Sequence, residues 1–226
     1  ISRSIQTDFF QNSQVFRVKI KELKDVGVSI EEDNKKHVLL KIFDPQKYMI
    51  NMESRTEPEE VIQKMVSHFR NEYISYKLID LHNQKNQHEQ ISKLKIYAFA
   101  FFRVYFKQNN KLEDPHRLEN YIAVGPVFLA EELTTKPKTI EDFVEGAKQL
   151  LHMHNSGVYH NDIKLSNVFM RKTKHKNNFV FIDYGLSEIK CVPKEKKSPK
   201  SSGGIDWCDF ETLAESMGIE KAEWER

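Results

Sequence analysis

The stretch VYHNDIKLSNVFM, residues 158–170, decides how the rest of this sequence is interpreted. Apolar residues lie at both of its ends, and between them stand the polar side chains of His160, Asn161, Asp162, Lys164, Ser166 and Asn167. Such a pattern predicts a polar loop held between two buried segments. Because loops on a rigid scaffold often carry binding and catalytic groups, the loop is a candidate functional site.

A second polar element follows within a few residues. The basic residues 171–176 predict a hairpin turn, and the apolar residues 179–182 predict a buried strand. Asp183-Tyr184-Gly185 comes directly after that strand, so a carboxylate stands where the strand ends. A short loop between two strands can bring this carboxylate and the side chains of residues 160–167 together.

These two elements resemble the protein kinase superfamily, whose catalytic loop reads HxDxKxxN and whose metal-binding turn is usually DFG. The matching residues are His160, Asp162, Lys164, Asn167, Asp183 and Gly185. Phosphoryl transfer needs a carboxylate beside the acceptor hydroxyl and oxygen ligands that hold Mg²⁺ against the nucleotide phosphates. The resemblance implies ATP and Mg²⁺ as cofactors.

The same resemblance assigns a role to each matching residue. Asp162 would orient or deprotonate the substrate hydroxyl, and Lys164 would contact the transferred phosphate. Asn167 and Asp183 would hold Mg²⁺. Because small-molecule kinases of this fold typically lack a lysine two residues after the aspartate, Lys164 favours the Ser/Thr protein kinases. The sequence DYGLS, residues 183–187, is most similar to the casein-kinase-1, vaccinia-related-kinase and haspin branches.

The N-terminal half is predicted to be mainly sheet with one long helix. Alternating or apolar stretches predict strands over residues 15–23, 37–43, 94–107 and 120–133. Helical spacing of apolar residues predicts a helix over residues 57–79. The Asn-, Gln- and Lys-rich residues 82–90 are expected to form a mobile loop.

The resemblance extends to nucleotide-binding residues in this half. Lys41, in Val38-Leu39-Leu40-Lys41, matches the strand lysine that contacts the nucleotide phosphates, and Glu72 is the best candidate for its helix partner. Lys41 could instead be an edge-strand charge, and Glu72 one of several solvated glutamates on the helix. Val18 would contact the nucleotide, and the backbone of Glu131 and Leu133 would reach the adenine.

The C-terminal half is predicted to be a reduced helical lobe. Thr139 and Asp142 predict a capped helix that residues 155–157 end. Asp206 would start a later helix and steady the catalytic loop. The expected fold is therefore α+β, a two-lobed kinase-like fold with a sheet-rich N-lobe over residues 1–133 and an abbreviated C-lobe over residues 134–226.

Several kinase features are missing from the sequence. Residues 11–18 stand where a glycine-rich loop is expected and contain no glycine, so close backbone approach to phosphates is obstructed. Asn161 replaces the usual arginine, which argues against regulation by phosphorylation of Ser198, Ser201 or Ser202. The chain ends soon after Asp206, so either the kinase is naturally minimal or segments are absent.

Composition excludes several other classes. The 35 Lys and Arg nearly balance the 33 Asp and Glu, so no global charge favours nucleic acid or a membrane surface. No apolar run approaches the length of a membrane span. The two cysteines form no zinc pattern or disulfide framework, which indicates a reducing compartment such as the cytoplasm or nucleus.

The sequence thus predicts ATP-dependent phosphorylation of Ser or Thr on protein substrates. A pseudokinase, a binding module that keeps the fold, is the first alternative because the glycines are missing. A small-molecule kinase is the second, which the short C-lobe permits and Lys164 argues against.

Overall fold

The computed structural model describes residues 14–24, 30, 36–43, 57–105, 121–173, 176–190 and 204–224. Within these residues the fold is mixed α+β with antiparallel sheets. Several of the sequence predictions extend to residues outside the described ones: residues 11–13 of the glycine-free segment, residues 106, 107 and 120 of two predicted strands, residues 174 and 175 of the predicted turn, and the three serines at 198, 201 and 202. The chain forms two compact units, Ile1–Phe69 with Lys95–Glu132, and Arg70–Leu94 with Leu133–Arg226. The expected division into lobes after residue 133 stays a prediction.

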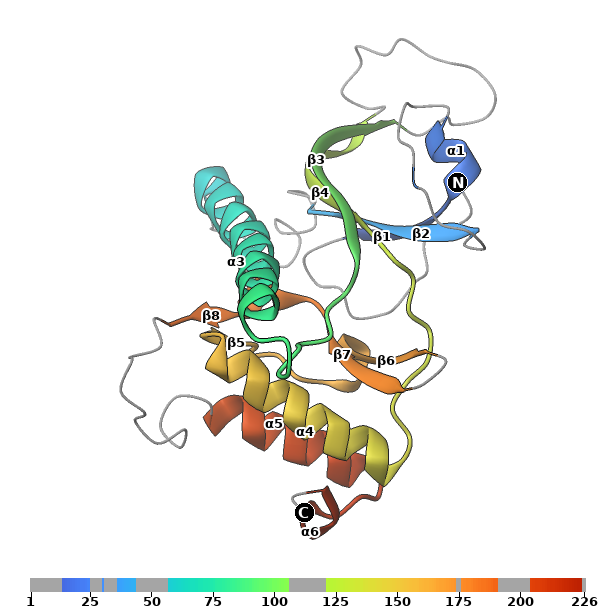
Figure 1. Cartoon of the computed structure of the whole chain (residues 1–226). Helices are drawn as coiled ribbons and strands as arrows, with labels where there is room; N and C mark the ends of the chain where they lie inside the picture. The colour runs from blue at the N-terminus through green and yellow to red at the C-terminus, as the bar shows by residue number, and fades with distance from the viewer. Residues whose placement is uncertain are drawn as a thin grey trace. The chain divides into compact units, whose positions relative to one another are not determined.

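The first unit contains a four-stranded antiparallel sheet. Its strands follow the spatial order β1 (Gln14–Lys19), β2 (His37–Ile42), β4 (Tyr121–Ala130) and β3 (Ile96–Tyr105) (Figure 1). Side chains alternate between the two faces of a strand, and residues directly opposite each other share a face. One face carries an apolar core cluster that includes Phe16, Val18, Val38, Ile42 and Leu129.

The first predicted strand ends earlier than expected. Residues 15–23 were expected to form one strand, but β1 ends at Lys19 and a short helix, α1 (Ile20–Lys24), follows. Ile20 and Leu23 are both buried in the apolar cluster, and their spacing of three residues suits one helical turn. Since Ile20 also continues the period-two pattern of β1, the sequence alone did not distinguish the two conformations.

Helix α3 (Pro58–Lys85) is longer than predicted, and the residues after it are not a loose loop. The Asn83 side chain accepts a hydrogen bond from the Ile91 N–H and donates one to the Ile91 carbonyl, both at 2.8 Å. Gln90 Nε2 donates to the carbonyls of Asn83, at 2.6 Å, and Asn86, at 2.8 Å. The expectation of a loop was wrong for residues 82–85, which belong to α3, and beyond them side-chain amides bind the backbone locally. The expected mobility of the remaining residues stays a prediction.

The second unit is built around helix α4 (Ile140–Asn155). Thr139 and Asp142 form the predicted capping box, and the helix ends at Ser156 and at Gly157, whose φ is 84°. Two short antiparallel pairs follow in this unit: β5 (Val158–Tyr159) with β8 (Glu188–Ile189), and β6 (Val168–Lys172) with β7 (Asn177–Phe181). Helices α5 (Gly204–Ser216) and α6 (Lys221–Trp224) complete it.

An aromatic core joins α4, α5 and β7. The ring of Phe143 lies 5.6 Å from that of Phe210 and 6.2 Å from that of Phe179, measured between centroids. Helices α4 and α5 pass side by side in Figure 1, as these contacts require. Gly146 on α4 stands where the rings of Phe179 and Phe210 meet, so the helix has no side chain at the point of closest packing.

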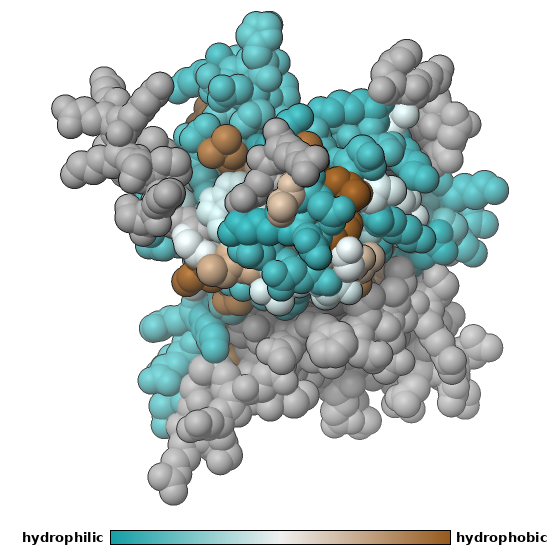
Figure 2. Space-filling view, turned by 90° about the horizontal axis from the view of Figure 1, so that it is seen from below, coloured by the Kyte–Doolittle hydropathy of each residue, from teal (hydrophilic) through white to brown (hydrophobic). Residues whose placement is uncertain are grey.

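On the face drawn in Figure 2 hydrophilic residues predominate, and hydrophobic side chains occur in small groups. Among the helices that the structure describes, none combines the length and the apolar character that crossing a membrane requires.

Gly146→Ala should destabilise the second unit. A Cβ at this position would lie 2.8 Å from Phe210 Cζ and 2.9 Å from the ring of Phe179, and both rings are buried. Overpacking of this kind costs about 1–3 kcal/mol, which exceeds the gain of about 1 kcal/mol in helix propensity. Urea unfolding followed by circular dichroism measures the difference. Gly204→Ala is the matched control, because a Cβ there meets nothing within 4 Å; an equal effect of both substitutions would contradict the packing argument.

Candidate functional site

The polar loop of residues 160–167 runs from β5 to β6, and Asp183 follows β7. Because β6 and β7 are antiparallel neighbours with Val168 opposite Phe181, the start of β6 lies beside the end of β7. The Ile182 N–H donates to the Asn167 carbonyl at 2.9 Å. The hairpin therefore brings the loop and the turn at Asp183 together, as the sequence pattern predicted.

Three of the predicted site residues form one hydrogen-bonded group. Lys164 Nζ lies 2.8 Å from Asp162 Oδ2 and 3.0 Å from Oδ1. Asn167 Nδ2 donates to the carbonyl oxygen and to Oδ2 of Asp162, both at 2.9 Å. Asn167 is buried and Asp162 is half-buried, so the amide holds the carboxylate in one orientation at the surface of the unit.

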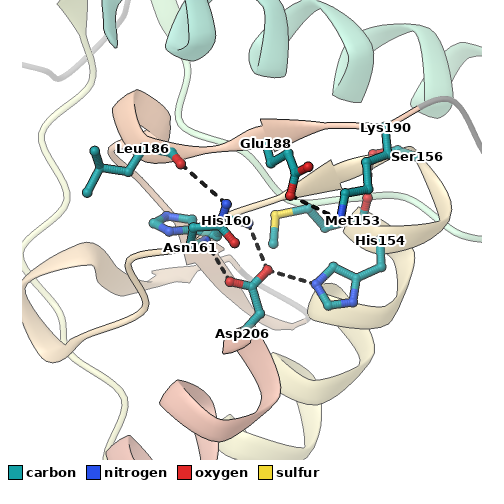
Figure 3. A network of polar contacts seen from close by, with 9 residues as sticks. All are labelled: Met153, His154, Ser156, His160, Asn161, Leu186, Glu188, Lys190 and Asp206. Atoms are coloured by element: carbon teal, nitrogen blue, oxygen red, sulfur yellow. Dashed lines mark hydrogen bonds and ion pairs between the residues drawn. The ribbon is translucent and has the colours of Figure 1, made fainter. Parts of the chain in front are cut away.

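The start of the loop is fixed by the buried carboxylate of Asp206 (Figure 3). Asp206 Oδ2 accepts from the His160 N–H at 2.7 Å, and Oδ1 accepts from the Asn161 N–H at 2.6 Å. His154 Nε2 donates to Oδ2 at 2.8 Å. The expected contact between the start of α5 and the loop is thus present, with His154 of α4 as an additional partner.

The hydrogen bonds of Asp206 determine the ionisation state of its carboxyl group. Burial alone would raise the pKa of Asp206, but the hydrogen bonds from His154, Asn161 and His160 together hold that pKa below its usual value. The carboxylate therefore stays charged at neutral pH, and its charge is balanced by oriented N–H groups.

His160 is a buried, neutral imidazole. Burial lowers its pKa, although the Ile182 carbonyl and nearby carboxylates act in the opposite direction. Its Nε2 lies 2.8 Å from the Ile182 carbonyl oxygen, and since a carbonyl only accepts, Nε2 carries the proton. His160 thus ties the loop to the residue before Asp183 and supports both halves of the site.

Asp183 and Asn161 both have left-handed backbone conformations, with φ of 67° and 60°. Aspartate and asparagine tolerate this region better than other residues with side chains, yet it still costs energy. Such positions are enriched at functional sites. The conformation also gives a reason for Asn161 at the position where the resemblance implies arginine.

The turn after Asp183 is held by the part of α3 that belongs to the second unit. Asn71 Nδ2 donates to the Gly185 carbonyl at 3.3 Å, and the hydroxyls of Ser75 and Ser187 are 2.8 Å apart in a buried setting. Tyr184 is buried edge-on against Tyr76, with ring centroids 5.2 Å apart. Burial, followed by the charge of Glu72, raises the pKa of the Tyr184 phenol, which stays protonated.

Lys41 lies in the first unit, in an interior strand of the sheet. It is 6% exposed, and its ammonium lies over the rings of Phe43 and Phe128 at 5.1 and 5.4 Å. The alternative of a solvent-facing edge charge is therefore wrong. Val15 pairs with Lys41 across the strands, whereas Val18 pairs with Val38 and faces the apolar cluster. The sheet thus places Val15, and not the predicted Val18, on the same face as Lys41.

The remaining predicted residues are distributed between the two units. Glu72 is 1% exposed and belongs to the second unit, so the alternative of a solvated glutamate is also wrong. Its pairing with Lys41 stays a prediction. Glu131 belongs to the first unit, where its N–H donates to the Lys95 carbonyl at 2.9 Å and its carboxylate accepts from the Lys95 N–H at 2.8 Å. Leu133 begins the second segment of the second unit and is half-buried.

The donor set suits a hard divalent cation. With Nδ2 of Asn167 committed to Asp162, its amide oxygen faces the other way, where the Ser166 hydroxyl donates to it at 3.3 Å. Amide and carboxylate oxygens, such as those of Asn167 and Asp183, are the type of oxygen ligand that Mg²⁺ takes, with water and phosphate oxygens filling other positions. Among the described residues no cluster of three His, Cys, Asp or Glu side chains forms a self-contained metal site.

Sequence reasoning missed several residues that build this site. Lys136 contacts the backbone of the loop, His154 binds Asp206, and Ser75 binds Ser187. The only local signal was the spacing of Asn71 and Ser75, which places both on one face of α3. The others act across long sequence separations that no local pattern reveals.

The chain matches no protein-family model, and a search of the curated proteins finds no match.

Asp206→Ala should unfold the second unit far more easily. The substitution leaves two loop N–H groups and His154 without their shared acceptor, and losing one partner of such a buried group costs about 3–5 kcal/mol. Urea unfolding at neutral pH measures the loss, with exposed Glu215→Ala on the same helix as the control.

The pH dependence gives an independent check. Because the folded-state pKa of Asp206 is lowered from 3.8, its contribution is complete above about pH 4 and disappears as the pH falls through the folded value. The stability difference between wild type and Asp206→Ala should therefore shrink only in acid. A difference that is small at pH 7 would contradict the anchoring role.

Proposed function

We propose that this protein transfers the γ-phosphoryl group of ATP to serine or threonine hydroxyls of protein substrates. The observation that carries the proposal is the hydrogen-bonded group of Asp162, Lys164 and Asn167, which stands on a loop anchored by Asp206 and lies beside the turn at Asp183. A carboxylate, an ammonium and oxygen ligands in one place meet the needs of phosphoryl transfer. The proposed fold is the two-lobed kinase-like fold.

Asp162 and Lys164 have different roles in the proposed reaction. Asp162 Oδ2, oriented by Asn167, accepts the hydrogen of the substrate hydroxyl and takes up its proton as the oxygen attacks phosphorus. Lys164, already within reach of Asp162, offers its positive charge to the oxygens of the moving phosphoryl group. A flexible lysine beside the catalytic carboxylate can serve both partners in turn.

Asn167 and Asp183 are the residues that would hold the metal. Bound Mg²⁺ supplies charge neutralisation and orientation of the nucleotide phosphates. Asn167 contributes its amide oxygen and Asp183 its carboxylate, while His160 and the Asn167–Ile182 hydrogen bond keep the two segments in register. Lys41, with Glu72 as its proposed partner, is the nucleotide-binding lysine of the proposal.

The pseudokinase alternative rests on the glycine-free segment at residues 11–18. It keeps the fold and predicts no turnover. Retention of Asp162, Lys164, Asn167 and Asp183 supports the enzyme instead. Measured turnover therefore separates the two proposals, and acceptance of protein rather than small hydroxyl compounds separates both from a small-molecule kinase.

Asp162→Asn should abolish turnover while it preserves nucleotide binding. The amide keeps the size of the side chain but is a far weaker base, and loss of a positioned base lowers the rate by about 10²–10⁴-fold. Transfer of labelled phosphate from Mg-ATP to casein measures the rate, with exposed Glu215→Gln as the control. A turnover equal to wild type would refute the assigned base, and no transfer by wild type would favour the pseudokinase.

Asp183→Asn should remove the magnesium dependence of nucleotide binding. The neutral amide loses the charge that attracts Mg²⁺ to the nucleotide phosphates. Mg-ATP should raise the melting temperature of wild type more than ATP with EDTA does, and this difference should vanish in the variant. Equal shifts in wild type with and without the metal would count against metal-dependent nucleotide binding.

A further inference from the structure

The side-chain ammonium of Lys136 contacts the polar loop and the residues directly after it. Its ammonium donates to the carbonyl oxygens of Leu165 at 2.6 Å, Val168 at 3.0 Å and Ser166 at 3.3 Å. A lysine ammonium has three N–H donors, and each of these oxygens uses one. The same nitrogen lies 3.3 Å from the centre of the Phe169 ring, which adds a cation–π contact.

These contacts surround the residue proposed to hold the metal. Asn167 is the last residue of a single 3-10 turn, Leu165–Asn167, closed by a 2.8 Å bond from its N–H to the Lys164 carbonyl. So short a turn has few bonds of its own. Lys136 binds the carbonyls of the residues directly before and after Asn167, so the backbone at Asn167 is fixed from both sides.

The backbone of Lys136 is itself held in place. The Thr135 carbonyl accepts from the Met170 N–H at 2.8 Å. Pro137 is buried and restricts Lys136 to an extended conformation. Two residues later the Lys138 N–H donates at 2.8 Å to Asp142, which also belongs to the capping box of α4. The side chain thus extends from a rigid base, and little entropy is lost when it binds the loop.

The surroundings of the Lys136 ammonium are consistent with a structural role for this group. Burial lowers the pKa of Lys136 to about 8, so the group is withdrawn from water yet remains mainly protonated at pH 7. An ammonium removed from water requires acceptors, and the carbonyl oxygens provide them.

We propose that Lys136 is a positioning residue whose ammonium, through the carbonyls of Leu165, Ser166 and Val168, fixes the turn of Asn167 and so sets the Mg²⁺ affinity of the site. The second half of this inference rests on the proposed function, whereas the first half concerns the loop alone. In this proposal Lys136 acts on the backbone of the loop and is not itself a ligand of the metal or the substrate. Its effect reaches the chemistry only through Asn167.

The first test needs no ligand. Amide hydrogen exchange of residues 163–170 is compared in wild type, Lys136→Met and Lys138→Met; Lys138 is exposed and serves as the matched control. Lys136→Met should speed exchange in these residues by about tenfold or more, the scale of a lost charge-assisted hydrogen bond, and should leave α4 unchanged. Unchanged exchange overturns the proposal, whatever wild type does with nucleotide.

A second variant keeps the test decisive if methionine disturbs packing. Lys136→Ala removes the three carbons and the nitrogen beyond Cβ, which n-propylammonium supplies in free form. This amine should restore slow exchange in residues 163–170 of Lys136→Ala. Tetramethylammonium, which carries charge but no N–H donor, should not. Equal effects of the two cations would overturn the hydrogen-bonding role.

The magnesium requirement separates positioning from general stability. The Mg²⁺ concentration for half-maximal ATP-dependent thermal shift should rise about tenfold in Lys136→Met and return toward wild type when n-propylammonium is added to Lys136→Ala. Faster exchange with an unchanged magnesium requirement overturns the link to the metal. If wild type shows no magnesium response, the proposed function and this link fail together, and the exchange data alone decide the loop contact.

Discussion

One buried carboxylate organises the second unit of this protein. Asp206 accepts hydrogen bonds from two consecutive loop N–H groups and from His154, and it thereby joins α4, α5 and the loop through polar contacts. A backbone segment between strands has N–H groups that must find acceptors when buried. By supplying them from the first turn of α5, the chain makes the loop conformation a consequence of how the two helices pack.

This dependence explains why an aromatic core matters for a polar site. Phe143, Phe179 and Phe210 set the spacing of α4, α5 and β7, and Gly146 lets the rings approach the helix closely. The helices in turn present Asp206 and His154 to the loop. The aromatic packing therefore influences the orientation of Asp162. It does so through Asp206, which binds His160 and Asn161, the two residues before Asp162.

The sequence was most informative where a local pattern coincided with a local structure. The capping box of Thr139 and Asp142, the hairpin after residue 170 and the approach of Asp183 to the loop depend on neighbours along the chain, and each was predictable. The end of β1 was not, because Ile20 satisfies both the strand and the helix period. The last turn of α3 and the backbone contacts after it were missed because composition does not reveal whether amides bind water or backbone.

The parts of the candidate site that could not be predicted from the sequence depend on contacts between residues far apart in the chain. The face that carries Lys41 is decided by the register of β1 against β2, which places Val15 opposite it. Val18, the residue on which the sequence was aligned, lies three positions further along β1 and therefore faces the apolar cluster on the other side of the sheet. Lys136 had no local signal, since a lysine before a proline is an ordinary feature until its partners are known. The spacing of Ser75 from Asn71 placed it on a face of α3 but did not reveal its partner, Ser187.

The left-handed residues Asn161 and Asp183 imply a compromise between folding and chemistry. Glycine would adopt both conformations with less strain, and selection for stability alone would favour it there. Glycine has neither a carboxylate nor an amide, however, so the chain retains side chains that cost it stability at two points in one site. A catalogue of stabilising substitutions for this protein would contain, at position 183, a change to glycine that relieves backbone strain and removes the carboxylate proposed to hold the metal.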